Sequence, residues 1–413
     1  MADPSGIHAR KAALRLCDAV LRRGETLDQA FGAATQDVRR FEDKALARAI
    51  AGETLRWLVD LDMAIDSATR QRLPADAKAR FVLRMMLAQW LRLGTPPHAV
   101  IATGLPLLAG GPRRLAHGVF STLSMREIAL PAAPTLPADV AERWGERSEA
   151  IALGLAELPP LDLTLRDPGE TRHWRTQLAA DSFAVGHLRL PRGENVEKLS
   201  GFAEGAWWVQ DFAASLPARL LGHGEDRRVL DLCAAPGGKT LQLAAAGWNV
   251  TALDMSKRRL DLLKANLKRT GLSAAPVRAD ALRWEPRHRF DAILLDAPCT
   301  ATGTARRHPD VLHRIGAHQI EEAAQLQAAL LMRAAEWLKP GGRLVYAVCS
   351  LEHLEGPEIA RQCELPIDRI EPGELPDGLS PDEKGWLRTD PGMFCGKGGL
   401  DGFFIARFRR PAE

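Results

Sequence analysis

The sequence contains few cysteines, and none of them is spaced as a disulfide framework or a zinc site requires. Six cysteines are spread over 413 residues, without a Cys-x-x-Cys pair or a cluster of histidine and cysteine. Secreted disulfide-rich domains and zinc sites both need closely spaced thiol or imidazole groups. The sequence therefore predicts no structural disulfides and no metal site, and it favours the reducing cytoplasm.

Long apolar runs and a secretion signal are also missing. No stretch approaches the ~20 consecutive apolar residues that cross a bilayer as a helix. Residues 1–6 lack the basic-then-apolar pattern of a secretion signal. We therefore expect no membrane partner. At 413 residues with 46% hydrophobic content, the chain is long enough for two domains, each with its own core.

The net charge of +3 is unevenly distributed along the chain. Residues 1–130 contain 19 Lys and Arg against 13 Asp and Glu, so this part carries the positive excess and the remainder is slightly acidic. A basic domain is typical of proteins that bind a polyanion such as RNA. The alternative is an arginine-rich helical surface without a ligand.

The apolar pattern divides the chain into a helical part and a part that alternates strands with helices. Helical spacing predicts an all-α domain over residues 1–130, with helices over 8–23, 44–70, 79–93, 96–108 and 112–124. A stretch rich in proline and alanine begins at Pro131. Residues 131–225 are therefore predicted to form a linker and a small subdomain.

From about residue 226, short apolar runs predict the strands of a sheet. These runs cover 228–232, 248–254, 276–280, 290–295, 342–348 and 401–408, with helical patterns over 256–270 and 318–338. Alternating strands and helices at this spacing predict an α/β domain over residues 226–413, with a doubly wound, mostly parallel sheet.

A turn of small residues follows the first of these strands and opens a helix. It consists of Cys233, Ala234, Ala235, Pro236, Gly237, Gly238, Lys239 and Thr240. A Gly-x-x-x-x-Gly-Lys-[Ser/Thr] phosphate loop is excluded because Cys233 occupies its first glycine position, and the dinucleotide pattern Gly-x-Gly-x-x-Gly is absent. Small residues nevertheless let a ligand approach the backbone N–H groups at the start of a helix.

Two aspartates end the next two strands and complete a pattern typical of nucleoside binding. Asp254 can accept hydrogen bonds from both ribose hydroxyls, and Asp280 can accept them from an adenine amino group. Together with the turn, this series fits S-adenosylmethionine better than a nicotinamide dinucleotide. The alternative for each aspartate is that it only caps the following helix.

Two cysteines about fifty residues apart follow two of the apolar runs. Cys299 lies three residues after Asp296, and Cys349 directly follows Val348. Ligands of open α/β folds bind at the carboxyl ends of the strands, so both thiols are expected at that edge. This position suggests covalent catalysis, although a free cysteine is often only a small buried hydrophobic residue. Spacing alone leaves open which thiol attacks.

These motifs stand in the order found in the RNA cytosine-5 methyltransferases, which the chain resembles. The matching segments are Ala235 to Thr240, Asp296 to Cys299, Arg306 to Asp310, Cys349-Ser350 and Asp401 to Phe404. Within this family the chain is most similar to the bacterial small-subunit ribosomal RNA enzymes of the Sun or RsmB type. Those enzymes join a NusB-like helical RNA-binding domain to a Rossmann-like class I methyltransferase domain. Residues 43–46 and 55–58 resemble the helical domain.

The resemblance implies S-adenosylmethionine-dependent formation of 5-methylcytosine in small-subunit ribosomal RNA. It implies a cofactor pocket made of residues 233–239 with Asp254, Asp280 and Asp296. It also implies Cys349 as the nucleophile, Cys299 as the thiol that assists release, and Asp296 at the edge of the cytosine. Lys239 could reach the base or only cap the turn. Arg306, Arg307 and His308 are expected on a loop that faces RNA, unless they are only a solvated charge run.

The sequence departs from the family pattern at three places beside the thiols. Val348 replaces the usual Thr before the nucleophile, and Thr300 replaces the usual Ser after Cys299. Residues 352–356 do not match the usual Glu-Glu-Asn. The last departure puts the contacts of this loop in doubt, but not the reaction.

The chemistry explains why thiols are needed. Carbon 5 of cytosine is a poor nucleophile, but a thiolate that adds to carbon 6 gives carbon 5 carbanion character. Carbon 5 can then attack a sulfonium methyl group without a metal, after which a base removes its proton and the thiol is eliminated. The base must leave its stack to be attacked, which favours unpaired RNA.

Two other functions remain open from the sequence. The same reaction could act on transfer RNA, although the transfer-RNA enzymes of the family generally lack the NusB-like domain. The chain could instead be an RNA-binding or ribosome-assembly protein with a dispensable catalytic half, against which the intact Cys349, Cys299 and Asp296 argue. Nothing indicates an obligate dimer, so we expect a monomer.

Overall fold

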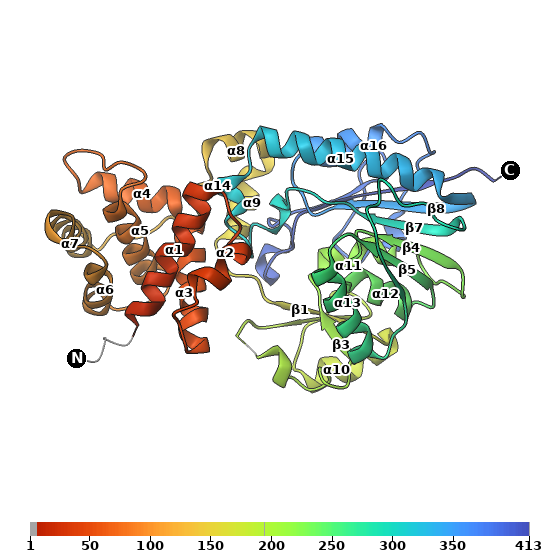
Figure 1. Ribbon diagram of the computed structural model, residues 1–413, viewed down its shortest axis with the longest axis horizontal. Coiled ribbons are helices and arrows are strands. Elements are labelled where there is room, and N and C mark those ends of the chain that lie inside the picture. Colours follow the sequence, from red (N-terminus) through yellow and green to blue (C-terminus); the bar gives the residue numbers. More distant parts are fainter. Residues whose placement is uncertain (1–5, 194, 413) are drawn as a thin grey trace. The chain divides into compact units, whose positions relative to one another are not determined.

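The computed structural model describes residues 6–193 and 195–412, which form two compact units (Figure 1). One unit contains the described residues up to Glu157 together with Ala305–Ile315. The other contains Leu158–Thr304 and the described residues from Gly316 onward. These bounds differ from the predicted domains 1–130, 131–225 and 226–413, because the middle stretch divides between the two units.

The first unit is entirely helical. Its helices are α1 (Ile7–Arg23), α2 (Leu27–Ala34), α3 (Phe41–Arg56), α4 (Leu58–Ser67), α5 (Lys78–Leu91), α6 (Pro97–Gly104), α7 (Gly110–Met125), α8 (Ala138–Trp144), α9 (Ser148–Leu155) and α14 (Val311–Arg314). The apolar faces of α1 to α7 enclose one core that includes Leu16, Ile50, Leu83 and Phe120. The pattern over 44–70 forms two helices, because the backbone of the buried Trp57 leaves the helical conformation between α3 and α4.

Residues 305–315 belong to the helical unit although they lie far from it in the sequence. Arg56 Nη2 donates a hydrogen bond to the backbone oxygen of Arg306 at 2.7 Å, and His313 Nε2 lies 2.6 Å from Leu55 O. The Arg306 side chain is itself only 1% exposed. The prediction that Arg306 faces RNA on a loop is therefore wrong, because the helical unit buries this residue; Arg307 is exposed and His308 is half-buried.

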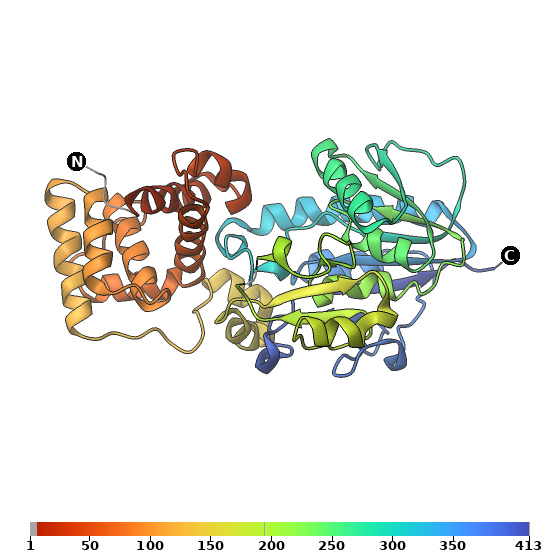
Figure 2. The ribbon, with the colours of Figure 1, turned by 90° about the horizontal axis from the view of Figure 1, so that it is seen from below.

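The second unit begins with a small antiparallel sheet (Figure 2). Its strands are β1 (Leu161–Leu165), β2 (His187–Leu190) and β3 (Trp207–Val209), in the order β2-β1-β3. Asp162 on β1 receives two hydrogen bonds from the Arg189 guanidinium on β2, both at 2.6 Å. Arg189 also donates to the backbone oxygens of Lys397 and Gly399 and thereby fixes the segment before β10 (Phe403–Arg409).

The main sheet of the second unit has seven strands. They are β4 (Arg228–Leu232), β5 (Asn249–Asp254), β6 (Ala275–Arg278), β7 (Phe290–Asp296), β8 (Leu338–Val348), β9 (Leu387–Thr389) and β10, in the order β6-β5-β4-β7-β8-β10-β9. The first five in this order are parallel, whereas β10 pairs antiparallel with β8 and β9. The predicted α/β class and mostly parallel sheet are confirmed; β9 was not predicted.

Helices cover both faces of this sheet because alternate strand residues point to opposite sides. Leu295 and Tyr346 pack with Leu330 and Leu331 of α15 (Ala317–Glu336). Their neighbours Leu294 and Val345 pack on the other face, where α11 (Phe212–Arg219) and α12 (Gly238–Ala245) lie. Figure 1 shows these two layers, with α13 (Lys257–Thr270) beside α12.

No helix among the described residues is long and apolar enough to cross a membrane.

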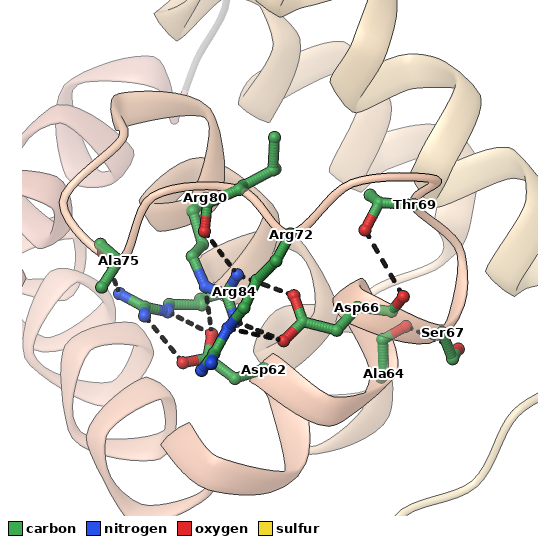
Figure 3. A network of polar contacts seen from close by, with 10 residues as sticks. Asp62, Ala64, Asp66, Ser67, Thr69, Arg72, Ala75, Arg80 and Arg84 are labelled. Carbon is green, nitrogen blue, oxygen red and sulfur yellow. Dashed lines mark hydrogen bonds and ion pairs between the residues drawn. The ribbon is translucent and has the colours of Figure 1, made fainter.

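Part of the positive charge of the helical unit is internal (Figure 3). Arg80, which is 1% exposed, donates to both carboxylate oxygens of Asp66 at 2.7 and 3.1 Å and to Asp62 at 2.9 Å. Arg84 binds Asp62 with two further hydrogen bonds. Burial opposes the charge on Arg80, but these carboxylates outweigh it and raise its pKa. These arginines form ion pairs inside the helical unit. The excess of Lys and Arg over Asp and Glu in residues 1–130 therefore overstates the positive charge available to an RNA.

The cluster makes a prediction about stability. Replacing Asp66 by alanine leaves the buried Arg80 short of a charged partner, and we expect the free energy of unfolding to fall by about 2 kcal/mol. Urea denaturation followed by circular dichroism measures the loss. The matched control is Asp37→Ala, which breaks the exposed 2.9 Å pair with Arg15 and is expected to cost less than about 1 kcal/mol. Equal losses in the two variants would contradict the structural role of the cluster.

Candidate active site

The strand order aligns the predicted site residues in one row along the carboxyl edge of the sheet. The row runs across β6, β5, β4, β7 and β8, and the residues at its five strand ends are Asp280, Asp254, the turn 233–239, Asp296 and Cys349. The loop after β7 adds Cys299 to the row. The structure therefore brings together all the predicted catalytic and cofactor-binding residues.

The turn after β4 is shaped by two residues with positive φ. Cys233 has φ 64°, and its successor Ala234 donates a backbone hydrogen bond to Leu253 O on β5. Gly237 has φ 109° and begins α12; a side chain there would be strained and its Cβ would lie 2.9 Å from Leu263. The turn thus closes tightly against β5.

Each strand-end aspartate makes local backbone contacts, but neither is the N-cap of a helix, since Ser256 caps α13 and a turn follows Asp280. Asp254 accepts hydrogen bonds from the backbone N–H groups of Ala235 at 3.1 Å and Ser256 at 2.8 Å. Asp280 accepts one from Leu282 N at 3.0 Å, and its side chain is 47% exposed. A carboxylate has about four acceptor positions, so these contacts leave room for a ligand on both residues.

Lys239 forms an ion pair with Asp296. Its Nζ lies 2.7 Å from Asp296 Oδ2 and 5.3 Å from the centre of the Phe403 ring. Burial opposes the ammonium charge, but the carboxylate of Asp296 outweighs it and raises the pKa of Lys239. The side chain therefore reaches the end of β7 rather than capping the turn, and its role toward the base stays a prediction.

The sequence did not single out Asp231, although it lies at the centre of this region. It is fully buried on β4, and Thr240 Oγ1 donates to its Oδ2 at 2.5 Å. Burial raises the pKa of Asp231 to about 7 and that of Cys233 to about 12. Both groups are therefore largely neutral near pH 6. A charged residue inside an otherwise apolar strand pattern was the signal that could have identified Asp231.

The two thiols face each other. Cys299 Sγ and Cys349 Sγ are 3.4 Å apart, within hydrogen-bonding distance for sulfur. The hydrogen bond to Cys349, burial, and the charges of Cys349 and Glu355 together raise the pKa of Cys299 well above its usual value. The raised pKa favours the protonated form of Cys299, and either sulfur can donate the hydrogen bond of the pair.

Within the described ranges, no group of three or more His, Cys, Asp or Glu side chains is arranged to hold a metal ion.

Comparison with protein families matches both parts of the chain. Residues 218–409 match the family described as 16S rRNA methyltransferase RsmB/F, and residues 7–107 match the NusB family. The matched ranges cover the main sheet and most of the helical unit. The predicted NusB-like character of the first helices is thereby confirmed.

Curated relatives match along most of the chain. A ribosomal RNA small subunit methyltransferase B from Xanthomonas campestris is 35% identical over 383 residues, which cover 84% of this chain and 85% of that protein. One from Klebsiella pneumoniae is 32% identical over 436 residues, covering 97% of this chain and 98% of that protein.

Solved structures share the fold. The crystal structure of PH0851 aligns with a TM-score of 0.73 at 23% identity, covering 98% of this chain and 99% of that one. The structure of NSun6 from Pyrococcus horikoshii with SFG aligns with a TM-score of 0.58 at 20% identity, covering 67% of this chain and 99% of that one. On the strength of the sequence relatives and the family match, the chain belongs to the 16S rRNA methyltransferase RsmB/F family.

Proposed function

We propose that this protein transfers a methyl group from S-adenosylmethionine to carbon 5 of a cytosine in small-subunit ribosomal RNA, through a covalent thiol adduct. The names of its curated relatives support ribosomal RNA as the substrate. The observation that carries the proposed chemistry is the pair of thiols 3.4 Å apart at the carboxyl edge of the sheet. We also propose that it acts as a monomer in the cytoplasm.

The residues along this edge fit S-adenosylmethionine in their chemistry. Asp280 and Asp254 offer acceptors for an adenine and a ribose, and the turn of small residues lies next to them in the row. Met255, which follows Asp254 and is 72% exposed, is an apolar side chain suited to cover a planar base. When bound, this cofactor supplies an electrophilic methyl group on a sulfonium.

Cys349 is the proposed nucleophile. Its Sγ lies 3.4 Å from Cys299 Sγ, and the ammonium of Lys239 is among the charges near it. Attack on carbon 6 of a cytosine makes carbon 5 nucleophilic. Asp296 keeps Oδ1 available because Lys239 binds Oδ2, and this second oxygen is proposed to hold the edge of the base near its ring nitrogen.

Cys299 is proposed to act after the methyl transfer. The pKa of Cys299 is raised mainly by its hydrogen bond to Cys349, by burial and by the charge of Cys349. Formation of the adduct removes that acceptor and that charge, so Cys299 ionises more easily at this stage than in the resting enzyme. Once its own proton has passed to solvent, the Cys299 thiolate takes the proton from carbon 5, and Cys349 leaves as a thiolate by elimination.

The nucleophile is tested by methyl transfer from labelled cofactor to small-subunit ribosomal RNA. We expect Cys349→Ala to lower the rate about a thousandfold or more, because it removes the sulfur on which the proposed adduct forms. Cys395→Ala removes an exposed thiol and serves as the control, with activity near that of wild type. Unchanged labelling by Cys349→Ala would exclude it as the nucleophile. Transfer RNA is tested in parallel, and labelling of neither RNA by wild type would favour the RNA-binding alternative.

The role of Cys299 is tested by trapping the intermediate. Without the thiol that assists release, Cys299→Ala is expected to accumulate a protein–RNA adduct that survives denaturing electrophoresis. The double variant that also carries Cys349→Ala should form none. Trapping by Cys349→Ala instead would show that the roles of the two thiols are reversed.

The neutral state of Asp231 predicts a pH dependence of stability. Its pKa is about 7 in the folded chain against 3.8 as the ordinary value. The folded chain therefore holds an extra proton between these values, so the contribution of this carboxyl to stability is complete below about pH 4 and is lost as the pH rises through 7. We expect the difference in unfolding free energy between wild type and Asp231→Asn to fall over this range. Urea denaturation at several pH values measures it, with the exposed Asp261→Asn as the control; a constant difference would contradict the prediction.

A further inference from the structure

A buried carboxylate connects the loops that carry the two thiols. Glu355 lies in the π-helical turn Leu354–Glu358 and is 0% exposed. Its Oε1 accepts hydrogen bonds from Thr300 N at 2.8 Å and from Gln327 Nε2 at 3.0 Å. Its Oε2 accepts one from Ser350 Oγ at 2.5 Å and another from Thr300 Oγ1. Four donors thus converge on one carboxylate.

Three of these four donors belong to the immediate neighbours of the two thiols in the sequence. Thr300 follows Cys299, and Ser350 follows Cys349. A single carboxylate therefore ties both thiol-bearing loops to the same point. Because a carboxylate can only accept hydrogen bonds, the hydroxyl groups of Thr300 and Ser350 must both point at it.

Further hydrogen bonds close the network around Glu355. Thr302 Oγ1 lies 3.2 Å from Ser350 Oγ and accepts a hydrogen bond from Leu351 N at 3.0 Å. Gln327 on α15 also donates to Pro298 O at 2.9 Å, and Tyr346 OH donates to Gln327 Oε1 at 3.1 Å. The two loops are thus held to each other and to α15 by buried groups, an arrangement that is rigid because each member has a partner.

We propose that Glu355 is a positioning residue that holds Cys299 and Cys349 at their working separation. The link to catalysis rests on the proposed function. The effect of Glu355 on the separation of the two thiols does not depend on that function. Small displacements matter in such a site, since a shift of about 1 Å can cost about a hundredfold in rate. Residues 352–356 depart from the Glu-Glu-Asn pattern of the family, but Glu355 in this segment still makes hydrogen bonds to both thiol-bearing loops.

The charge of Glu355 has a second effect on the same pair. The groups whose charges bear on Cys299 are Cys349 at the end of β8 and Glu355 in the π-helical turn, and both favour its protonated form. Tyr346 lies close enough to Cys299 for its own pKa to be raised, first by burial and then by the Cys299 and Glu355 charges. Glu355 therefore supports both the position and the protonation of Cys299.

Two substitutions separate these effects. In Glu355→Gln, the amide oxygen can replace Oε1 while its NH₂ donates to Thr300 and Ser350, whose hydroxyls can rotate to accept. This variant keeps the connection and removes the charge. Glu355→Ala removes both, and Ser350→Ala releases only the Cys349 loop, with less risk to folding.

The separation of the thiols can be measured without RNA. Dibromobimane alkylates a thiol with loss of bromide and then either bridges to a second thiol or is quenched by added glutathione. The ratio of bridged to singly modified protein, mapped to Cys299 and Cys349 by mass spectrometry, reports their proximity rather than their reactivity. We expect this ratio to fall about tenfold in Glu355→Ala and to fall in Ser350→Ala, and to stay near wild type in Glu355→Gln.

The matched control is Asp60→Ala in the helical unit. Asp60 likewise accepts a backbone N–H and a hydroxyl hydrogen bond from one threonine, Thr135, at 2.9 and 2.6 Å. Its loss should leave the ratio unchanged. Bridging at the wild-type ratio in Glu355→Ala and Ser350→Ala, or an equal fall in Asp60→Ala, would overturn the proposal.

Methyl transfer to RNA then connects the position of the thiols to catalysis. We expect kcat of Glu355→Ala to fall at least about tenfold with little change in KM for the cofactor, and Glu355→Gln to recover most of kcat. A fall in bridging without any methylation by wild type would refute the proposed function and leave the role of Glu355 in place. Normal kcat in a variant with lowered bridging would overturn the catalytic role.

Discussion

The pairing of β7 with β8 is the constraint on which the site depends. In its parallel register Asp296 lies opposite Ala347, so the loops that follow the two strands start side by side. Cys299 comes three residues after the one position and Cys349 two residues after the other. A slip of one residue would turn every side chain of one strand to the opposite face and separate the thiols. The buried runs of both strands, which pack on both faces of the sheet, oppose such a slip.

The charges around the site are arranged so that few of them are unpaired. Asp231 is held largely neutral by burial, whereas the Lys239 ammonium is balanced by Asp296. Glu355 carries its negative charge among four donors. Each arrangement avoids the high cost of an isolated ion in a region of low dielectric. At the thiol pair, the hydrogen bond, burial and nearby charges raise the pKa of Cys299.

Features that depend on local pattern could be predicted from the sequence, and features that depend on distant contacts could not. The strands, the turn at residues 233–239 and the aspartates at the strand ends follow from apolar runs and the residues that end them. The burial of Arg306 could not be predicted, because a charge run is normally solvated and its partners lie some 250 residues away. The bridging role of Glu355 was missed for the same reason, since its donors come from three separate segments.

The return of residues 305–315 to the helical unit has a consequence for how the molecule can be divided. The chain passes between the two units three times, after Glu157, after Thr304 and after Ile315. A truncated chain that begins at Leu158 therefore keeps residues 305–315 but lacks the rest of the helical unit. Val311, Leu312 and Ile315, which are buried in the full chain, have then lost the helices that bury them. The two units are consequently not interchangeable modules joined end to end. Any recombination of this scaffold has to carry both parts of the helical unit together.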